Sequence, residues 1–322
     1  SFINYQIIKA ETLAYSSEMQ KKLSGAHKLS GLELTLLHKE YGSFIGRSVR
    51  EFLGKDLTAD FIASHGHTVF HNPDKQLTLQ IGDGAFIAAN SGIPTISDFR
   101  NSDTAFGGQG APLVPVGDKL LFSDYDYCLN LGGFANISYD KDGQRLAFDI
   151  CPANIIANAL AQQSGEKYDE NGKMGSRGRL NEKLITELNH LDFYKKTGPK
   201  SLGREYAEAK VFPIFENYEI PIEDKLHTLY EHIAFQIKQA TAEKKSAKIL
   251  ITGGGAYNGY LIRRIRTVSG HRIIIPDDTL IQYKEALIFA LLGLLRAGKA
   301  NNVLASYTGA KRNTTGGIVH YV

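Results

Sequence analysis

Three acidic residues lie beside apolar segments of the sequence. A carboxylate in such a place is expected to be partly buried, which makes it a candidate for a catalytic or binding role. Asp149 follows "RLAF", Asp98 follows "PTIS" and precedes Arg100, and Glu285 precedes "ALIFALLG". Burial raises the pKa of a carboxyl group, which suits a general base, so Asp149 is the strongest catalytic candidate. A structural interpretation stays open for each: Asp149 as a cap for the helix expected from about Ala153, Asp98 as an ion-pair partner of Arg100, and Glu285 as a helix-start residue beside the dipole.

Glycines follow two expected strands directly. "NLGGFAN" contains Gly132 and Gly133, and "ITGGGAYN" contains Gly253, Gly254 and Gly255. Glycine lets the backbone approach an anion closely, and the second segment opens an expected helix, whose N-terminus favours phosphate. Together with "GGQGAP", these segments favour nucleotide binding, although none has a Walker A or GxGxxG pattern. A tight turn is the structural alternative for each.

The segment "SHGHTVFH" concentrates histidines at His65, His67 and His71. Their spacing fits no common zinc pattern, so we favour a hydrogen bond from this loop, including His65 and Gly66, to a sugar or phosphate. The chain has two cysteines, Cys128 and Cys151, so no disulfide framework is expected. We interpret Cys151 as a small buried thiol rather than a nucleophile.

Length and composition narrow the class of protein. A chain of 322 residues suggests about two domains. The net charge of +3, without a basic block, gives nucleic-acid binding little support. The first residues have neither a basic nor an apolar signal-peptide region, and no apolar run reaches the length of a membrane span. We therefore expect a cytoplasmic protein with neither nucleic acid nor membrane as a partner.

The order of the expected elements indicates an α/β fold. An alternating pattern over 4–15 predicts an opening strand, followed by helices near 16–24 and 31–54. "DYCLNLGG", "FANISYD" and "RLAFDI" predict an antiparallel meander, with "KDGQ" as its second turn. Later strands alternate with helices, one of them over 283–297, which predicts mixed sheets. The first half lacks about two of the strands that open the second half.

Taken in order, these segments resemble the anhydro-N-acetylmuramic acid kinase family. The resemblance rests on "SHGHTVFH", "TLQIGDGAFIAANSGIPTISDFRNSDTAFGGQGAPLVP", "LNLGGFANIS", "AFDICPAN", "ILITGGGAYN", "EALIFALLGLLR" and "TGAKRNTTGG". It implies the two-domain fold of the actin, hexokinase and Hsp70 group, which is ribonuclease-H-like with a cleft between domains. The domains would be residues 1–122, with part of 298–322 packing on them, and residues 123–297.

The resemblance also implies a reaction and its residues. The family opens the 1,6-anhydro ring of anhydro-N-acetylmuramic acid with water and phosphorylates O6, using ATP and Mg²⁺, in peptidoglycan recycling. Asp149 would be the base that activates water. The implied sugar-binding residues are His65, Gly66, Asp98, Arg100 and Glu285. Gly132 and Gly133 would form a phosphate loop, Gly253, Gly254 and Gly255 an adenosine loop, and the family suggests a homodimer.

The sequence departs from the family pattern at two places. The family usually begins with a strand and a "GTSxDGxD"-like phosphate loop, which this sequence does not contain, so we expect the chain to be incomplete at its N-terminus. The family also often has "DTGPGN" at its catalytic aspartate, where this chain reads "DICPAN" from Asp149. A kinase for another sugar of the same fold group and a non-catalytic sugar or nucleotide binder are the alternative functions.

Overall fold

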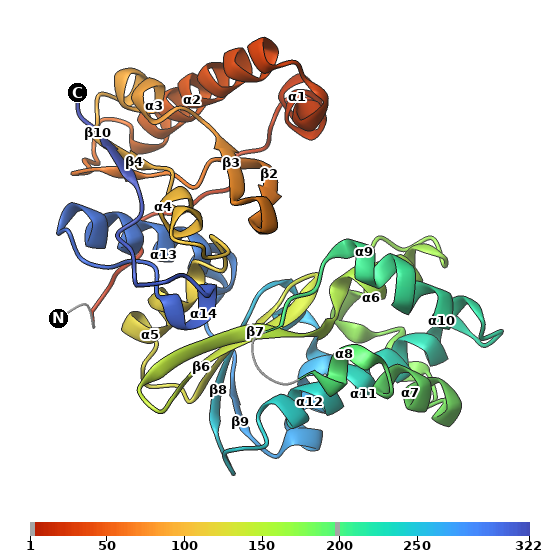
Figure 1. Cartoon of the computed structure of the whole chain (residues 1–322). Coiled ribbons are helices and arrows are strands. Elements are labelled where there is room, and N and C mark those ends of the chain that lie inside the picture. Colours follow the sequence, from red (N-terminus) through yellow and green to blue (C-terminus); the bar gives the residue numbers. More distant parts are fainter. Residues whose placement is uncertain (1–3, 197–199) are drawn as a thin grey trace. The chain divides into compact units, whose positions relative to one another are not determined.

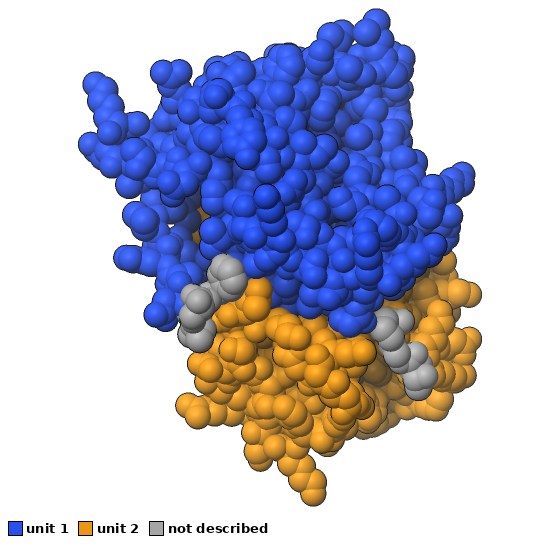
Figure 2. Space-filling model, turned by 60° about the vertical axis from the view of Figure 1, so that its left-hand side comes forward, with its two compact units in different colours: residues 1–117, 285–322 blue, residues 118–284 orange. Residues whose placement is uncertain are grey.

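The computed structural model describes residues 4–196 and 200–322, which separate into two compact units (Figures 1 and 2). Unit 1 holds the described residues up to 117 and those from 285 onward, and unit 2 holds the described residues from 118 to 284. Each unit has its own sheet and its own apolar packing, so each is described by itself.

These limits differ from the domain boundaries expected from the sequence. Residues 118–122 group with unit 2, and residues 285–297 group with unit 1. The reason lies in helix α13 (Asp278–Ala297), which is continuous across the second limit. The sequence has no glycine or proline at Lys284 or Glu285 that would have indicated a division there.

Unit 2 is built on a five-stranded mixed sheet with the order β7-β6-β5-β8-β9 (Figure 1). The bounds are Tyr127–Leu131 for β5, Phe134–Lys141 for β6, Gln144–Pro152 for β7, Lys248–Thr252 for β8 and Arg272–Ile274 for β9. Strands β5, β6 and β7 pair antiparallel, whereas β8 pairs in parallel with both β5 and β9. The expected meander and mixed sheet are therefore confirmed.

The turn between β6 and β7 shows why this hairpin forms. Asp142 has φ of 51° and Gly143 has φ of 79°, so both central residues lie in the left-handed region. A two-residue hairpin with this backbone twist matches the twist of its strands, and Asp-Gly is one of the favoured pairs. The "KDGQ" segment thus sets the register that places Asp149 opposite Asn136.

Helices pack on this sheet because its central strands are apolar. Leu129 of β5 and Ile251 of β8 are fully buried, as expected for strands covered by other elements. The same core takes in apolar residues of α6, α11 and α12. The helices of unit 2 are α6 (Asn154–Gln162), α7 (Glu182–Asn189), α8 (Asp192–Lys195), α9 (Arg204–Tyr206), α10 (Phe212–Glu216), α11 (Ile222–Ala240) and α12 (Gly259–Ser269).

Unit 1 contains a small mixed sheet and a separate hairpin. Strand β4 (Thr95–Ser97) pairs in parallel with β1 (Ile62–Ala63) and antiparallel with β10 (Ile318–His320), which comes from the C-terminal end of the chain. The hairpin joins β2 (His67–Asn72) to β3 (Leu77–Ile81).

The helices of unit 1 include a closely packed pair. Helix α2 (Gly31–Leu53) starts with a capping box between Ser30 and Glu33 and packs on α3 (Gly84–Ser91). A methyl group added at Gly42 or Gly46 of α2 would lie 2.6 Å from a carbonyl oxygen at the α3 side. The other helices are α1 (Ser17–Gly25), α4 (Asn101–Ala105) and α14 (Ala305–Thr308); α5 (Val114–Leu121), like α13, runs from one unit into the other.

The opening strand expected over 4–15 is wrong. The described part of this segment is neither strand nor helix, and Ile8 is 78% exposed. An alternating pattern yields a strand only when another strand accepts its hydrogen bonds, and no described strand pairs with this segment. Within residues 4–196 and 200–322, no helix combines the length and the apolar character needed to cross a bilayer.

Candidate active-site residues in the two units

The candidate residues of unit 2 lie at one edge of its sheet. Strands β5 and β8 are parallel neighbours, and the glycine segments 132–133 and 253–255 follow them directly. Strand β7 runs in the same direction as β5, because two antiparallel pairings separate them. Asp149 therefore lies toward the same carboxyl edge, where ligands of α/β sheets usually bind. Figure 1 labels β7, β6, β8 and β9 of this sheet, in which β5 lies between β6 and β8.

Asp149 does not cap a helix, so that structural interpretation is wrong. Helix α6 begins after Ala153, which receives no side-chain capping bond. The Asp149 carboxylate instead accepts a hydrogen bond from the Leu202 amide at 2.7 Å. The register of β7 shifts beside Asp149, so that Ile150 has no partner on β6, and such bulges often re-aim a side chain next to an active site.

The surroundings of Asp149 act on its pKa in opposite directions. Burial raises the pKa of this carboxyl group, whereas hydrogen bonds from the Leu202 amide and the Ser201 side chain lower it. Burial is the larger effect, so the pKa of Asp149 lies above its usual value. The group can thus accept a proton more readily than a solvated aspartate while remaining fixed by the 200–202 segment.

The first glycine segment is attached to the start of α6 through its carbonyl groups. Gly133 accepts hydrogen bonds from the amides of Ala153 (2.8 Å) and Ile155 (3.2 Å), and Gly132 accepts one from Asn154 (3.2 Å). A methyl group added at Gly133 would meet no atom closer than 3.9 Å. Protein packing therefore does not require glycine at 133, which leaves space for a ligand to approach the backbone.

The second segment divides into packed and open glycines. Gly253 has φ of 84°, and a methyl group at Gly255 would lie 2.6 Å from the Leu131 side chain at the end of β5. These two glycines are explained by the close approach of two strand ends. Gly254 is exposed, and a methyl group there would have its nearest neighbour, the Asn154 amide, at 3.7 Å.

The expected phosphate site at the helix after this segment is corrected. Residues 254–257 form a 3₁₀ turn, and α12 begins only at Gly259. The Gly259 amide donates to Asn171 at 2.9 Å, and the Leu261 amide donates to Asn258 at 2.9 Å. Because protein side chains already satisfy these helix-end amides, we assign no phosphate to them.

In unit 1, Arg100 and His65 form a hydrogen-bonded pair. The Arg100 Nε and Nη2 groups lie 3.0 and 2.8 Å from His65 Nε2, and Nη1 donates to the Gly110 carbonyl at 2.6 Å. Since arginine can only donate, His65 Nε2 is the acceptor, and the proton on Nδ1 is donated to the Gly66 carbonyl at 2.9 Å. Burial, helped by the Arg100 charge, lowers the pKa of His65 to about 4.

Asp98 lies beside this pair in a strained backbone conformation. Its φ is 59°, a value that non-glycine residues rarely adopt and that costs about 1–3 kcal/mol. The expected ion pair with Arg100 is not among those of the described residues. The Asp98 carboxylate accepts instead from Asn101 at 2.6 Å. Such strain concentrates at functional sites.

Glu285 is not a helix-start residue, so that interpretation is also wrong. Helix α13 begins at Asp278, which places Glu285 well inside the helix and exposed. Burial lowers the pKa of Arg100, and the negative charge of Glu285 opposes that shift. Unit 1 thus brings His65, Arg100 and Glu285 into one electrostatic neighbourhood.

The remaining candidates have structural surroundings. His71 is hydrogen-bonded to Thr78 at 3.2 Å within the β2–β3 hairpin, and the described residues hold no group of three or more metal-ligating side chains. Cys151 is completely buried, and burial raises the pKa of its thiol, so it is no nucleophile.

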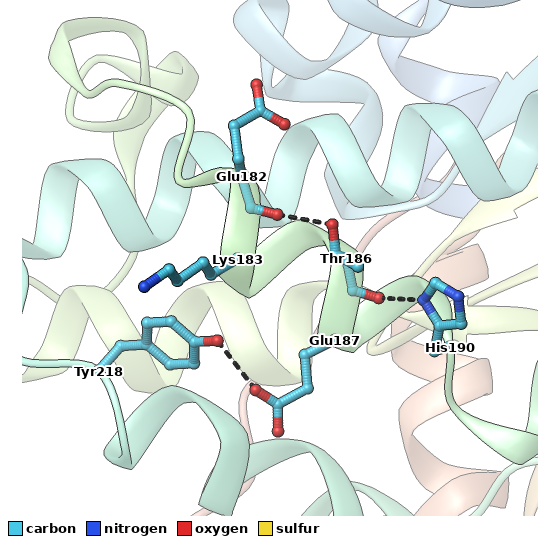
Figure 3. A pocket seen from close by; sticks show the side chains of 6 residues that line it. All are labelled: Glu182, Lys183, Thr186, Glu187, His190 and Tyr218. Atoms are coloured by element: carbon cyan, nitrogen blue, oxygen red, sulfur yellow. Dashed lines mark hydrogen bonds between the residues drawn. The ribbon is translucent and has the colours of Figure 1, made fainter.

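A surface pocket of unit 2 contains none of the predicted residues. Figure 3 shows hydrogen bonds among its lining residues: the Tyr218 hydroxyl donates to the Glu187 carboxylate at 2.9 Å, and the Thr186 hydroxyl donates to the Glu182 backbone carbonyl at 2.7 Å. We assign this pocket no role. Its lining consists of Glu182, Lys183, Thr186, Glu187, His190 and Tyr218.

Two groups of contact residues were missed from the sequence. Ser201 and Leu202 stabilise the Asp149 carboxylate from more than fifty positions away, and nothing in their types signals this. Asp103 is completely buried and holds the loop that receives Arg100. Its spacing of three residues from Arg100, one helical turn, is the only signal that could have found it.

The fold and these residues define the class of protein. A meander whose first strand pairs in parallel with a later strand, with glycine turns after both, is the arrangement of the actin-like, ribonuclease-H-like α/β proteins. The chain belongs to the anhydro-N-acetylmuramic acid kinase family, whose model matches residues 4–322.

Relatives in this family resemble most of the chain. The anhydro-N-acetylmuramic acid kinase of Gloeobacter violaceus is 37% identical over 280 residues, which cover 80% of this chain and 74% of the relative. That of Aliivibrio fischeri is 34% identical over 293 residues, covering 85% and 78%. Solved structures align weakly: the activator of the 2-hydroxyisocaproyl-CoA dehydratase from Clostridium difficile has a TM-score of 0.39 at 19% identity, over 64% of this chain and 68% of that one.

Proposed function

We propose that this protein is a kinase that opens the 1,6-anhydro ring of anhydro-N-acetylmuramic acid with water and phosphorylates O6. The product is N-acetylmuramic acid 6-phosphate, an intermediate of peptidoglycan recycling. The observation that carries the proposal is the partly buried Asp149 carboxylate, with its raised pKa, in a chain of this family. A neutral-pH hydrolytic step needs such a base near the attacking water.

In the proposed reaction, Asp149 accepts a proton from water while the water oxygen attacks the anomeric carbon. The bond between that carbon and O6 breaks, and O6 keeps its electron pair. O6 then attacks the γ-phosphorus of ATP, and ADP leaves. Positioning and charge neutralisation supply most of the catalysis in phosphoryl transfer, so the protein's main contribution is orientation.

Recognition of the sugar is proposed for His65, Gly66, Asp98, Arg100 and Glu285. Arginine has five N–H donors, and the described bonds to His65 and Gly110 use three of them. The other two can donate to sugar oxygens, with Glu285 as a nearby acceptor for a hydroxyl group. The fixed guanidinium thus offers a directional site for a polar ring substituent.

For ATP we propose the segment of Gly132 and Gly133, with open space at Gly133, and the open backbone at Gly254, with Gly253 and Gly255 holding the second segment against β5. Mg²⁺ usually keeps several waters and binds through nucleotide phosphates and few carboxylates. Because the described residues contain no cluster of metal-ligating side chains, we assign Mg²⁺ to the phosphates of ATP and derive no step from a protein-bound metal.

A coupled ADP-release assay tests the proposed function. It should be run with anhydro-N-acetylmuramic acid, on this chain and on the chain extended by any residues encoded upstream of Ser1. We expect sugar-dependent ADP release and a 6-phosphate product. Turnover only with other amino sugars would indicate a kinase of different specificity. Calorimetric binding of sugar or nucleotide without turnover in either chain would indicate a binding protein.

We also propose a cytoplasmic homodimer, without nucleic acid or membrane as a partner. The family and the small net charge of +3 support this proposal. Light scattering during size-exclusion chromatography tests the oligomeric state, since a dimer would have about twice the chain mass of 35.5 kDa. A monomer at all concentrations would contradict it.

A further inference from the structure

The glycine-rich loop 106–110 uses its polar backbone groups within unit 1. The Gly110 carbonyl accepts from Arg100 Nη1 at 2.6 Å, and the Gly110 amide donates to Asp103 Oδ2 at 2.8 Å. The Gln109 amide donates to the Thr308 carbonyl at 2.9 Å. A loop whose amides already have protein partners is a poor phosphate cradle.

Asp103 is the centre of this arrangement. Its side chain is 0% exposed, and besides the Gly110 amide it accepts a hydrogen bond from the Thr308 hydroxyl at 2.8 Å. The Gly108 amide donates to the Asp103 carbonyl at 2.9 Å. A buried carboxylate is costly unless its oxygens are satisfied, so these bonds hold the loop and the C-terminal segment together.

The glycine at 108 follows from the same contacts. A methyl group there would overlap the Asp103 carboxylate and lie 2.8 Å from the Ala310 side chain. Only glycine lets the loop close over the buried aspartate. Packing around Asp103 therefore explains Gly108 of "GGQGAP", the segment whose glycines favoured nucleotide binding from the sequence.

We propose that Asp103, through the 106–110 loop, is a positioning residue for sugar binding. It fixes the Gly110 carbonyl, which holds Arg100 Nη1, while His65 holds Nε and Nη2. These two anchors fix the guanidinium and leave two of its five N–H groups for a ligand. The inference deepens the proposed function, because it rests on Arg100 as a sugar-binding residue.

The test compares Asp103→Asn with Thr104→Val, a matched control on the same helix. The asparagine keeps the size of the side chain, but only one of its two terminal atoms is an oxygen. It therefore cannot accept from both the Gly110 amide and the Thr308 hydroxyl at separate atoms, as the carboxylate does. The valine removes a buried hydroxyl that, among the described residues, donates to the Asn101 carbonyl within α4. We expect hydrogen exchange of the Arg100 Nε–H, followed by NMR, to accelerate in Asp103→Asn and to stay unchanged in Thr104→Val. Unchanged exchange in Asp103→Asn would overturn the inference.

Binding measurements give a second arm. Calorimetry without ATP should show an affinity for anhydro-N-acetylmuramic acid about tenfold weaker in Asp103→Asn, with the affinity for ATP unchanged. Equal losses for both ligands would mean a general structural role and would overturn the inference. If Asp103→Asn does not fold, Thr308→Val, which removes one of the two donors, replaces it in both arms. If the unchanged protein binds no sugar, the proposed function fails, whereas the NMR arm still decides whether Asp103 positions Arg100.

Discussion

At the scale of single residues, surroundings rather than residue type decide which groups can react. Asp149 and Asp142 lie on the same hairpin, yet the first is partly buried with a raised pKa and the second is an exposed turn residue. Burial disfavours the charged carboxylate, and two hydrogen bonds partly restore it. That balance suits a group that must both lose and regain a proton.

Asp149→Asn should abolish most of the proposed activity. Because asparagine cannot accept the proton of the attacking water, we expect kcat to fall by about 10²–10⁴-fold. The melting temperature should change little, since the amide oxygen can still accept from Leu202. The control is Asp142→Asn, because asparagine tolerates a positive φ. Steady-state assays of both variants measure the effect, and an Asp149→Asn enzyme with unchanged kcat would remove this residue from the mechanism.

His65 should make folding stability depend on pH. The pKa of His65 is about 4 in the folded protein, whereas a histidine of the unfolded chain has its usual pKa of 6.5. Between these two pH values the unfolded chain therefore binds more protons than the folded protein. The contribution of His65 to the free energy of unfolding is thus present at neutral pH and is lost as the pH falls from 6.5 toward 4, by at most about 3 kcal/mol. His65→Gln keeps an acceptor for Arg100 but does not titrate.

Chemical denaturation at pH 7 and pH 4.5 measures this contribution. The difference in the free energy of unfolding between the two pH values should be smaller for His65→Gln than for the unchanged protein. Other histidines with lowered pKa values, among them His232, contribute equally to the pH dependence of the free energy of unfolding in both proteins. Identical slopes would show that the folded-state pKa of His65 is not depressed.

At the scale of elements, adjacent glycines have different tasks. Gly255→Ala would push a methyl group against Leu131 and should cost about 1–3 kcal/mol of stability. Gly254→Ala has open space and should leave the melting temperature within the range of an ordinary surface substitution. If the segment binds ATP, Gly254→Ala should raise KM for ATP while KM for the sugar stays constant. Thermal denaturation and steady-state kinetics of both variants measure these effects. A larger loss of stability in Gly254→Ala than in Gly255→Ala would contradict the different roles assigned to the two glycines.

Elements with local signals were predicted well. The 142–143 turn, the meander and the capped helix α2 follow from neighbouring residues, because turn and cap chemistry act within four positions. The strand expected over 4–15 failed, since a strand also needs a partner that no local pattern reports. The start of α13 was placed five residues late, so Glu285 was taken for a helix-start residue.

At the scale of the whole molecule, a buried ion pair connects the first and the last residue of unit 2, Asp118 and Lys284. Lys284 lies 2.7 Å from Asp118, with side chains only 8% and 5% exposed, and Ser138 also donates to the Asp118 carboxylate. The two residues come from α5 and α13, the helices that run from one unit into the other. Removal of one partner leaves a buried charge without its counter-ion.

Lys284→Met should therefore destabilise the protein by about 3–5 kcal/mol in urea denaturation. Adding Asp118→Asn should recover part of that loss, because the buried charge is then removed. The neighbouring pair of Lys119 and Asp140 is partly exposed at 3.7 Å, so the control Lys119→Met should cost about 1 kcal/mol or less. Equal costs for the two lysine variants would show that the buried pair contributes no more than a surface pair.

The sequence by itself determined the class of fold, the family and the residue types available for chemistry, because periodicity, turn residues and ordered motifs are local properties. Only the tertiary structure decided what each group contacts: the 200–202 segment beside Asp149, the neutral tautomer of His65, and the buried Asp103 beneath the 106–110 loop. Hydrogen bonds, burial and the resulting pKa shifts depend on residues distant in sequence, which a local pattern cannot report.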